Sequence, residues 1–169
     1  IMDQSKKGDQ PLSLRDKPDQ ILICNGEIYN YKSLAKQHDF ELESGSDCEI
    51  ILHMIERFGI LETLKSLDGV FAFVYYDRVT ETFYVARDPF GVRSLYIGLT
   101  RKNNVVFSSE LKSMDELVST CDQFRPGHYM IIHKDTTDYT PVPYFEYEFP
   151  LIDKHYEGDP TPFVSEMSR

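Results

Sequence analysis

The sequence contains no tryptophan, no long apolar segment and comparatively few basic residues. No apolar run approaches the roughly 20 residues that a membrane-spanning helix requires, which argues against a membrane protein. The 18 lysine and arginine residues are outnumbered by 28 aspartate and glutamate residues, so the formal net charge is −10. This acidity argues against nucleic acid or an anionic membrane surface as the main partner, but it leaves a small zwitterionic ligand open.

Cysteine and histidine are also scarce. The three cysteines, Cys24, Cys48 and Cys121, are odd in number and lack the spacing of a metal or redox motif. This favours a reducing compartment, and we therefore expect a cytoplasmic protein. The five histidines are scattered along the chain, so we expect no metal site. The 169 residues, 41% of them hydrophobic, suffice for one domain with a substantial core.

An Asn-Gly pair separates a predicted strand from a predicted helix. Residues 21–24 are apolar and largely β-branched, which indicates a buried strand, and residues 28–37 have helical spacing. A joint of this kind can aim the amide side chain of Asn25 and the backbone N–H of Gly26 at one point, where they would hold the negative oxygen of a tetrahedral intermediate. A hairpin turn and a joint without any chemistry are the alternatives, although the following residues do not alternate as a hairpin requires.

A candidate acid lies at the start of another predicted helical segment. Ser46 and Glu49 have the spacing of a capping box, and the apolar residues after them predict a helix that stops at Gly59. Asp47 would then lie in the first turn, where a carboxylate stabilises the helix dipole. Spacing alone favours that role over the alternative, in which Asp47 faces the ammonium group of a ligand.

The remaining pattern predicts a layered α+β fold with many short strands. Residues 70–77 are apolar on both faces, which is typical of a strand in the middle of a sheet. Further strands are predicted at residues 12–14, 39–43, 82–87, 95–99, 105–108 and 128–133, a tight turn at 88–93, and helices at 61–67 and 110–117.

Several short motifs occur in an order that resembles one family, the glutamine-hydrolysing domain of asparagine synthetases, a class II glutamine amidotransferase. The resemblance covers residues 1 to about 144. The motifs are Gln10-Pro11-Leu12, Asn25-Gly26-Glu27-Ile28-Tyr29-Asn30, Gly45-Ser46-Asp47-Cys48-Glu49, Asp68-Gly69-Val70-Phe71-Ala72-Phe73, Arg87-Asp88-Pro89-Phe90-Gly91-Val92, Ser109-Glu110-Leu111-Lys112 and Pro126-Gly127-His128-Tyr129.

The resemblance implies a fold of the N-terminal-nucleophile hydrolase type, four layers ordered α/β/β/α with two antiparallel sheets. It implies an amidotransferase domain over residues 1–149 and a linker over 150–169 toward a C-terminal synthetase domain. The implied reaction is hydrolysis of glutamine to glutamate and ammonia, which the synthetase domain uses with ATP and Mg²⁺ to convert aspartate to asparagine. No cofactor is expected in the amidotransferase domain itself, and a homodimer is possible.

The resemblance also implies a set of site residues. Asn25 and Gly26 match the oxyanion hole, Glu27 a glutamine-site residue, and Asp47 the carboxylate that receives the α-ammonium group of glutamine. Ile1 and Met2 match a segment whose backbone contacts glutamine. The resemblance therefore favours ligand binding by Asp47, whereas spacing alone favours stabilisation of the helix dipole.

The family's nucleophile is a cysteine at the mature N-terminus, and no residue of this chain matches it. We therefore expect the segment by itself not to turn over glutamine. Cys24 is a poor substitute, because it would point away from the Asn25 pocket and has no adjacent base. Two alternatives stay open: a non-catalytic domain of the same fold, and a glutaminase domain that feeds a different acceptor.

Overall fold

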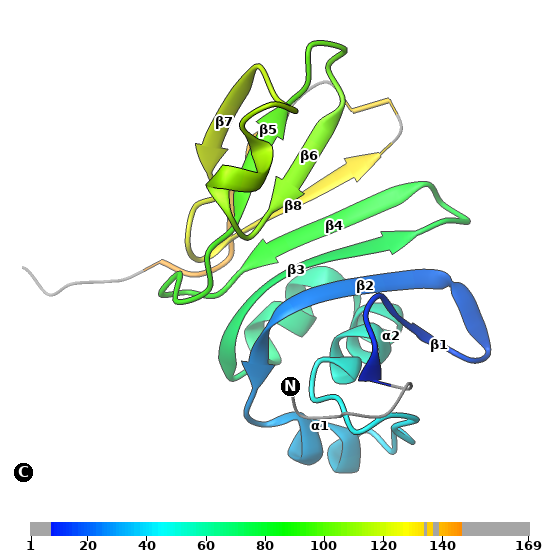
Figure 1. The fold of residues 1–169 in the computed structure, drawn as a ribbon. Helices are drawn as coiled ribbons and strands as arrows, with labels where there is room; N and C mark the ends of the chain where they lie inside the picture. The colour runs from blue at the N-terminus through cyan, green and yellow to red at the C-terminus, as the bar shows by residue number, and fades with distance from the viewer. Residues whose placement is uncertain (1–7, 134, 137–138, 147–169) are drawn as a thin grey trace, which may run out of the picture.

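The computed structural model describes residues 8–133, 135–136 and 139–146. Its strands form two antiparallel sheets (Figure 1). The larger sheet has the strand order β1-β2-β3-β4-β8-β9 and the smaller has the order β6-β5-β7. The strands are β1 (Leu12–Leu14), β2 (Lys17–Ile28), β3 (Gly69–Asp77), β4 (Thr82–Arg87), β5 (Tyr96–Leu99), β6 (Val105–Ser108), β7 (Thr120–Gln123), β8 (His128–His133) and β9 (Val142–Pro143).

Two helices, α1 (Tyr31–Gln37) and α2 (Glu49–Ser66), lie on one side of the larger sheet, and the smaller sheet lies on the other (Figure 1). Two hydrophobic clusters follow from this layering. Leu22, Phe71 and Phe73 pack with the helices, whereas Val85 and Phe124 belong to the cluster between the sheets. The predicted α+β class with two antiparallel sheets is confirmed.

The outer face of the smaller sheet is covered by a single 3-10 turn, η2 (Leu111–Met114). A Cβ atom on Gly98 of β5 would lie 2.8 Å from side-chain atoms of both Met114 and Val118. Within the described residues, this short segment takes the place of the fourth layer. The predicted helix at 110–117 is thus only partly present.

Strand β3 lies in the interior of the larger sheet, as its continuous apolar pattern predicts. It pairs with β2 on one side, where Phe73 faces Cys24, and with β4 on the other, where Phe73 faces Ala86. Its side chains contact the helix layer on one face and the smaller sheet on the other. Because both faces are buried, the side chains on both are apolar. The predicted strands at 12–14, 82–87, 105–108 and 128–133 are also present.

Helix α2 contains a break at Gly59, whose φ of 75° and ψ of 171° are non-helical. The sequence predicts that one helix stops at Gly59 and that a second follows it. The structure confirms both, as two helical segments on either side of the break. Glycine is suited to this position because a positive φ is costly for residues with a Cβ atom.

Several local predictions are wrong. Residues 39–43 form no strand, because Glu43 donates its N–H to the side chain of Glu49 rather than to a neighbouring strand. The sequence does not predict strand β7, because Thr-Cys-Asp-Gln lacks apolar alternation. Pairing with β5 stabilises this strand. The predicted strand break at Asn25-Gly26 is absent, because β2 continues to Ile28. The predictions for Ile1, Met2 and residues 150–169 lie outside the described residues.

Candidate active site on the edge of strand β2

Strand β2 presents alternate backbone groups to its outer edge. The backbone N–H and C=O of Phe71 in β3 bond to Asp88 and therefore point toward β4. Gly26 of β2 lies opposite Phe71, so its own N–H and C=O point away from β3, to the outer edge of β2. The same alternation governs Cys24, whose N–H and C=O bond to the side-chain amide of Gln10 at 2.8 and 2.7 Å. Gly26 therefore directs its N–H outward, toward the space between Gln10 and Asp47.

Asn25 and Gly26 lie inside β2, which continues to Ile28, and not at its end. The prediction of a break there is wrong because β3 pairs with β2 as far as Gly69. The glycine is needed for close packing, since a Cβ atom at Gly26 would lie 2.4 Å from the carbonyl oxygen of Val70 and 2.7 Å from Cα of Phe71. Helix α1 accordingly begins later than predicted, at Tyr31.

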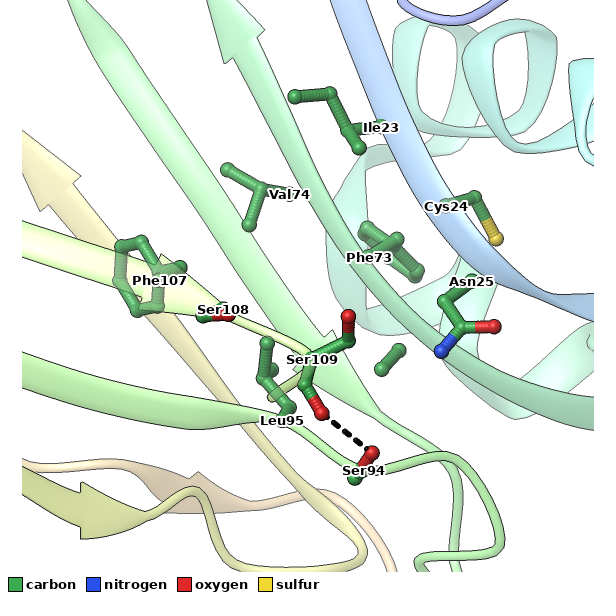
Figure 2. A pocket seen from close by; sticks show the side chains of 11 residues that line it. Ile23, Cys24, Asn25, Phe73, Val74, Ser94, Leu95, Phe107, Ser108 and Ser109 are labelled. Atoms are coloured by element: carbon green, nitrogen blue, oxygen red, sulfur yellow. Dashed lines mark hydrogen bonds between the residues drawn. The ribbon is translucent and has the colours of Figure 1, made fainter. Parts of the chain in front are cut away.

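The carboxamide of Asn25 lies on the face of β2 opposite to Cys24, as strand alternation requires. It borders a cavity of about 320 Å³ whose other walls include Val74, Leu95 and Phe107. Figure 2 shows the amide directed toward Ser109, whose carbonyl oxygen accepts a hydrogen bond from the hydroxyl of Ser94 at 2.7 Å. Asn25 also borders a second cavity.

Asp47 reaches β2 from the loop that precedes α2. Its side chain is buried, with 4% of the residue exposed, and its Oδ2 atom accepts the N–H of Ile28 at 2.6 Å. The predicted position in the first helical turn is wrong, because α2 begins at Glu49 and Cys48 is its N-cap residue. The predicted capping box is also not formed, since the side chain of Glu49 bonds to Glu43 and Ser44.

The second cavity, of about 530 Å³, brings together Asn25, Gly26, Glu27 and Asp47. Its volume is within the range of roughly 300–1,000 Å³ that is usual for small-molecule sites. Residues that sequence reasoning did not assign to the site also border it, and they are Gly8, Asp9, Gln10, Cys24, Ser46, Cys48 and Arg93. Ile1 and Met2 lie outside the described residues, so their predicted contact with glutamine stays a prediction.

Arg93 is the one cation on the described part of this cavity wall. Its Nη2 atom lies 3.5 Å from Oε1 of Glu27, while its Nε atom is buried without a hydrogen-bond partner in the described structure. Its backbone N–H is bound by the buried carboxylate of Asp88 at 3.2 Å. The Asp-Pro-Phe-Gly sequence predicts the turn that precedes Arg93, but it does not by itself indicate that Arg93 is a site residue.

The two cysteines at the cavity are buried, and Cys24 is unsuited to nucleophilic attack. A hydrogen bond to Cys48 and burial together raise the pKa of the Cys24 thiol well above its usual value, so the reactive thiolate is disfavoured at neutral pH. Cys48 lies against β2, with Sγ 3.9 Å from the carbonyl oxygen of Gly26. Cys48 is buried and packs as a small apolar residue.

This arrangement can bind an amino acid and polarise a carbonyl group. Asn25, with an amide side chain, and Gly26, with an outward backbone N–H, line the cavity together with Asp47, whose carboxylate is buried. Hydrogen-bond donors of this kind stabilise developing negative charge, and a carboxylate of this kind attracts an ammonium group. Within the described residues, no three His, Cys, Asp or Glu side chains are grouped as metal ligands, and no helix is long and apolar enough to cross a membrane.

The relatives of this chain include asparagine synthetases. The chain is 41% identical to a probable glutamine-hydrolyzing asparagine synthetase of Acanthamoeba polyphaga mimivirus, over 78% of this chain and 24% of the relative. It is 42% identical to a glutamine-hydrolyzing asparagine synthetase of Arabidopsis thaliana, over 72% of this chain and 21% of the relative. The chain thus spans between a fifth and a quarter of the length of these curated relatives.

Solved structures give the same fold. The glutamine phosphoribosylpyrophosphate amidotransferase of B. subtilis superposes with a TM-score of 0.72 at 25% identity, over 85% of this chain and 33% of the other. The allosteric regulatory enzyme of purine biosynthesis superposes with a TM-score of 0.71 at 26% identity. These neighbours confirm the predicted fold of the N-terminal-nucleophile hydrolase type. Residues 1–145 match the family described as the glutamine amidotransferase domain, and the chain therefore belongs to this family.

Proposed function

We propose that this chain is the glutaminase part of an asparagine-synthetase-type ligase. Glutamine is hydrolysed to glutamate and ammonia, and a separate ATP-dependent domain uses the ammonia to convert aspartate to asparagine. The observation that carries the proposal is the convergence of Asn25, Gly26 and Asp47 on one cavity. The similarity to named glutamine-hydrolyzing asparagine synthetases supports the choice of reaction.

In this proposal, Asn25 and Gly26 form the oxyanion hole. The side-chain amide and the outward N–H come from successive residues of β2, and β3 pairs with both, so the two donors are held in place before the substrate binds. Donors that are already in place stabilise the oxyanion of the tetrahedral intermediate without a cost of reorganisation.

Asp47 holds the α-ammonium group of glutamine. Its Oδ2 atom is fixed by the N–H of Ile28, and its side chain borders the cavity. Glu27 and Arg93 supply one charge of each sign at the same cavity, where they contribute to recognition of a zwitterion. The nucleophile is a cysteine that no described residue provides.

The acceptor of the ammonia rests on similarity to relatives alone. We propose aspartate as acceptor and ATP with Mg²⁺ as the requirement of the synthetase domain. The cytoplasmic location and the homodimer stay predictions. A glutaminase domain that feeds a different acceptor is the second candidate, because the structural neighbours include an amidotransferase named for phosphoribosylpyrophosphate.

The test is an assay of the full-length gene product with glutamine, ATP, Mg²⁺ and aspartate. We expect glutamate and asparagine in equal amounts, and loss of glutamate release in Asn25→Ala. Glutamate release without asparagine formation would contradict the aspartate acceptor alone. Absence of both glutamate release and glutamine binding would favour the non-catalytic alternative and contradict the proposal. The isolated segment, assayed in parallel, is expected to release no glutamate.

A further inference from the structure

We infer that Glu49 is a positioning residue for glutamine, which acts by ordering the loop that carries Asp47. The inference rests on the proposed function, since it concerns the same cavity. It assigns a role to a buried acid that the proposed chemistry does not itself use.

The loop between residues 39 and 48 has little regular secondary structure to hold it. It nevertheless carries Ser46 and Asp47 to the cavity, both of them buried. A loop without backbone pairing needs side-chain contacts to define one conformation, because ordering its backbone is entropically costly.

Glu49 supplies those contacts. It is 3% exposed, and its Oε1 atom accepts the N–H of Glu43 at 2.6 Å, while Oε2 accepts the N–H of Ser44 at 2.7 Å. The hydroxyl of Ser44 also bonds to Oε2. The ring of His53, one helical turn later, lies 3.2 Å from Oε1 and stacks on Phe40.

The contacts then continue to the cavity. The hydroxyl oxygen of Ser44 accepts the N–H of Ser46 at 3.1 Å, and the next residue, Asp47, bonds to the N–H of Ile28 at 2.6 Å. Glu49 is therefore connected through Ser44 and Ser46 to the carboxylate that faces the ligand. Both oxygens of Glu49 are occupied by protein groups, which fits a support and not a direct ligand.

The substitution Glu49→Gln tests this role in the full-length gene product. A glutamine side chain replaces one acceptor oxygen with an NH₂ group that faces donors, so the loop loses its fixed conformation. Since hydrogen bonds to charged groups are stronger than neutral ones, we expect KM for glutamine to rise on the order of tenfold. We expect kcat to change by less than about twofold, because ground-state binding is what is lost.

A substrate analogue separates positioning from general damage. Glutaramate has the amide and the carboxylate of glutamine but lacks the α-ammonium group. If Glu49 acts through Asp47, Glu49→Gln leaves kcat/KM for glutaramate nearly unchanged. The double variant with Asp47→Asn behaves like Asp47→Asn alone, because coupled residues are not additive.

The matched control is Glu62→Gln on the same helix, where the acid is exposed and pairs with Lys65. It leaves KM unchanged. If Glu49→Gln does not fold, as judged by its melting transition, Ser44→Ala removes the hydroxyl that joins Glu49 to Ser46 and raises KM in the same direction by a smaller factor. An active wild type with unchanged KM in Glu49→Gln, or with equal losses for glutamine and glutaramate, overturns the inference and leaves the proposed function intact. A wild type without glutaminase activity overturns both.

Discussion

Asn25 and Gly26 are neighbours in the chain that contribute to the site in different ways. Asn25 contributes its side chain, which projects from one face of β2, whereas Gly26 contributes its backbone N–H, which projects from the strand edge. A single strand can present both because faces and edges alternate with the same period. Gly26 is also confined by β3, since any Cβ atom would collide with the backbone at Val70.

The first prediction concerns Asn25→Ala. Removal of one oxyanion-hole donor typically lowers kcat by roughly 10²–10³-fold, because the interaction forms only in the transition state. We expect a loss of this size in glutamate release by the full-length gene product, with KM for glutamine changed little. Steady-state kinetics measures both. The control Asn104→Ala, in the turn between β5 and β6, retains full activity. A fall in affinity without a fall in kcat would contradict the role.

At the scale of elements, buried acids organise the two loops that approach the cavity. The carboxylate of Glu49 accepts hydrogen bonds from the loop before α2, and the carboxylate of Asp88 accepts hydrogen bonds from the turn after β4. The Oδ1 atom of Asp88 accepts the N–H groups of Phe90 and Val92 at 3.0 and 3.1 Å. Its Oδ2 atom accepts the N–H groups of Phe71 and Arg93, both at 3.2 Å. Each carboxylate therefore replaces the backbone pairing that these loops lack.

The second prediction concerns Asp88→Asn. An amide in place of the carboxylate faces two N–H groups with its own NH₂, so we expect the free energy of unfolding to fall by roughly 1–3 kcal/mol. Urea denaturation measures this. Asp77→Asn is the matched control, because Asp77 caps a surface turn through the N–H groups of Val79 and Thr80. Equal effects of the two substitutions would contradict a special role for the buried acid.

The third prediction concerns Glu49 and acid. Burial raises the pKa of this carboxyl group, but hydrogen bonds from His53, Ser44 and Glu43 outweigh burial, so its pKa in the folded protein is lowered. The unfolded chain binds the proton more readily, and stability therefore falls as pH drops through the folded-state pKa. We expect Glu49→Gln to weaken the loss of stability below pH of about 4, the usual range of glutamate. Denaturation curves at pH 3 to 7 measure this, with Glu62→Gln as the control that keeps the wild-type dependence.

At the scale of the whole molecule, the two sheets are held together by an apolar cluster. Phe124 is fully buried there with Val85, Leu95 and Met130, and its carbonyl oxygen accepts a hydrogen bond from Arg87 at 2.6 Å. The cavity beside Asn25 lies between the same two sheets. The position of the smaller sheet therefore determines what Asn25 faces.

The fourth prediction concerns this cluster. Phe124→Ala leaves a cavity in a closely packed core, so we expect a loss of about 3–5 kcal/mol in the free energy of unfolding. Phe90→Ala is the control, since Phe90 is 70% exposed and surface substitutions usually stay within about 0.5 kcal/mol. Thermal or urea denaturation distinguishes them. A small loss for Phe124→Ala would show that the sheets are not coupled through this residue.

Much of the fold could be predicted from local patterns of residues in the sequence. Strand β3, the strand at 82–87 and the break at Gly59 follow from apolar periodicity and from the backbone freedom of glycine, which act over a few residues. The short strand β7 and the absence of a strand at 39–43 do not follow from local pattern. Strand β7 exists because it pairs with β5, and residues 39–43 form no strand because Glu43 bonds to the side chain of Glu49 instead.

The sequence by itself determined the family, the two-sheet α+β class and the identity of Asn25, Gly26, Glu27 and Asp47 as residues to examine, because these depend on residue types in a fixed order. The tertiary structure alone decided that Gly26 faces outward from inside a strand, that Asp47 precedes its helix, that Arg93 lines the cavity, and that Glu49 is joined through Ser44 to the loop of Asp47. These facts depend on which strand pairs with which edge and on which loops a buried acid brings together. Such long-range contacts leave no periodic signal in the chain.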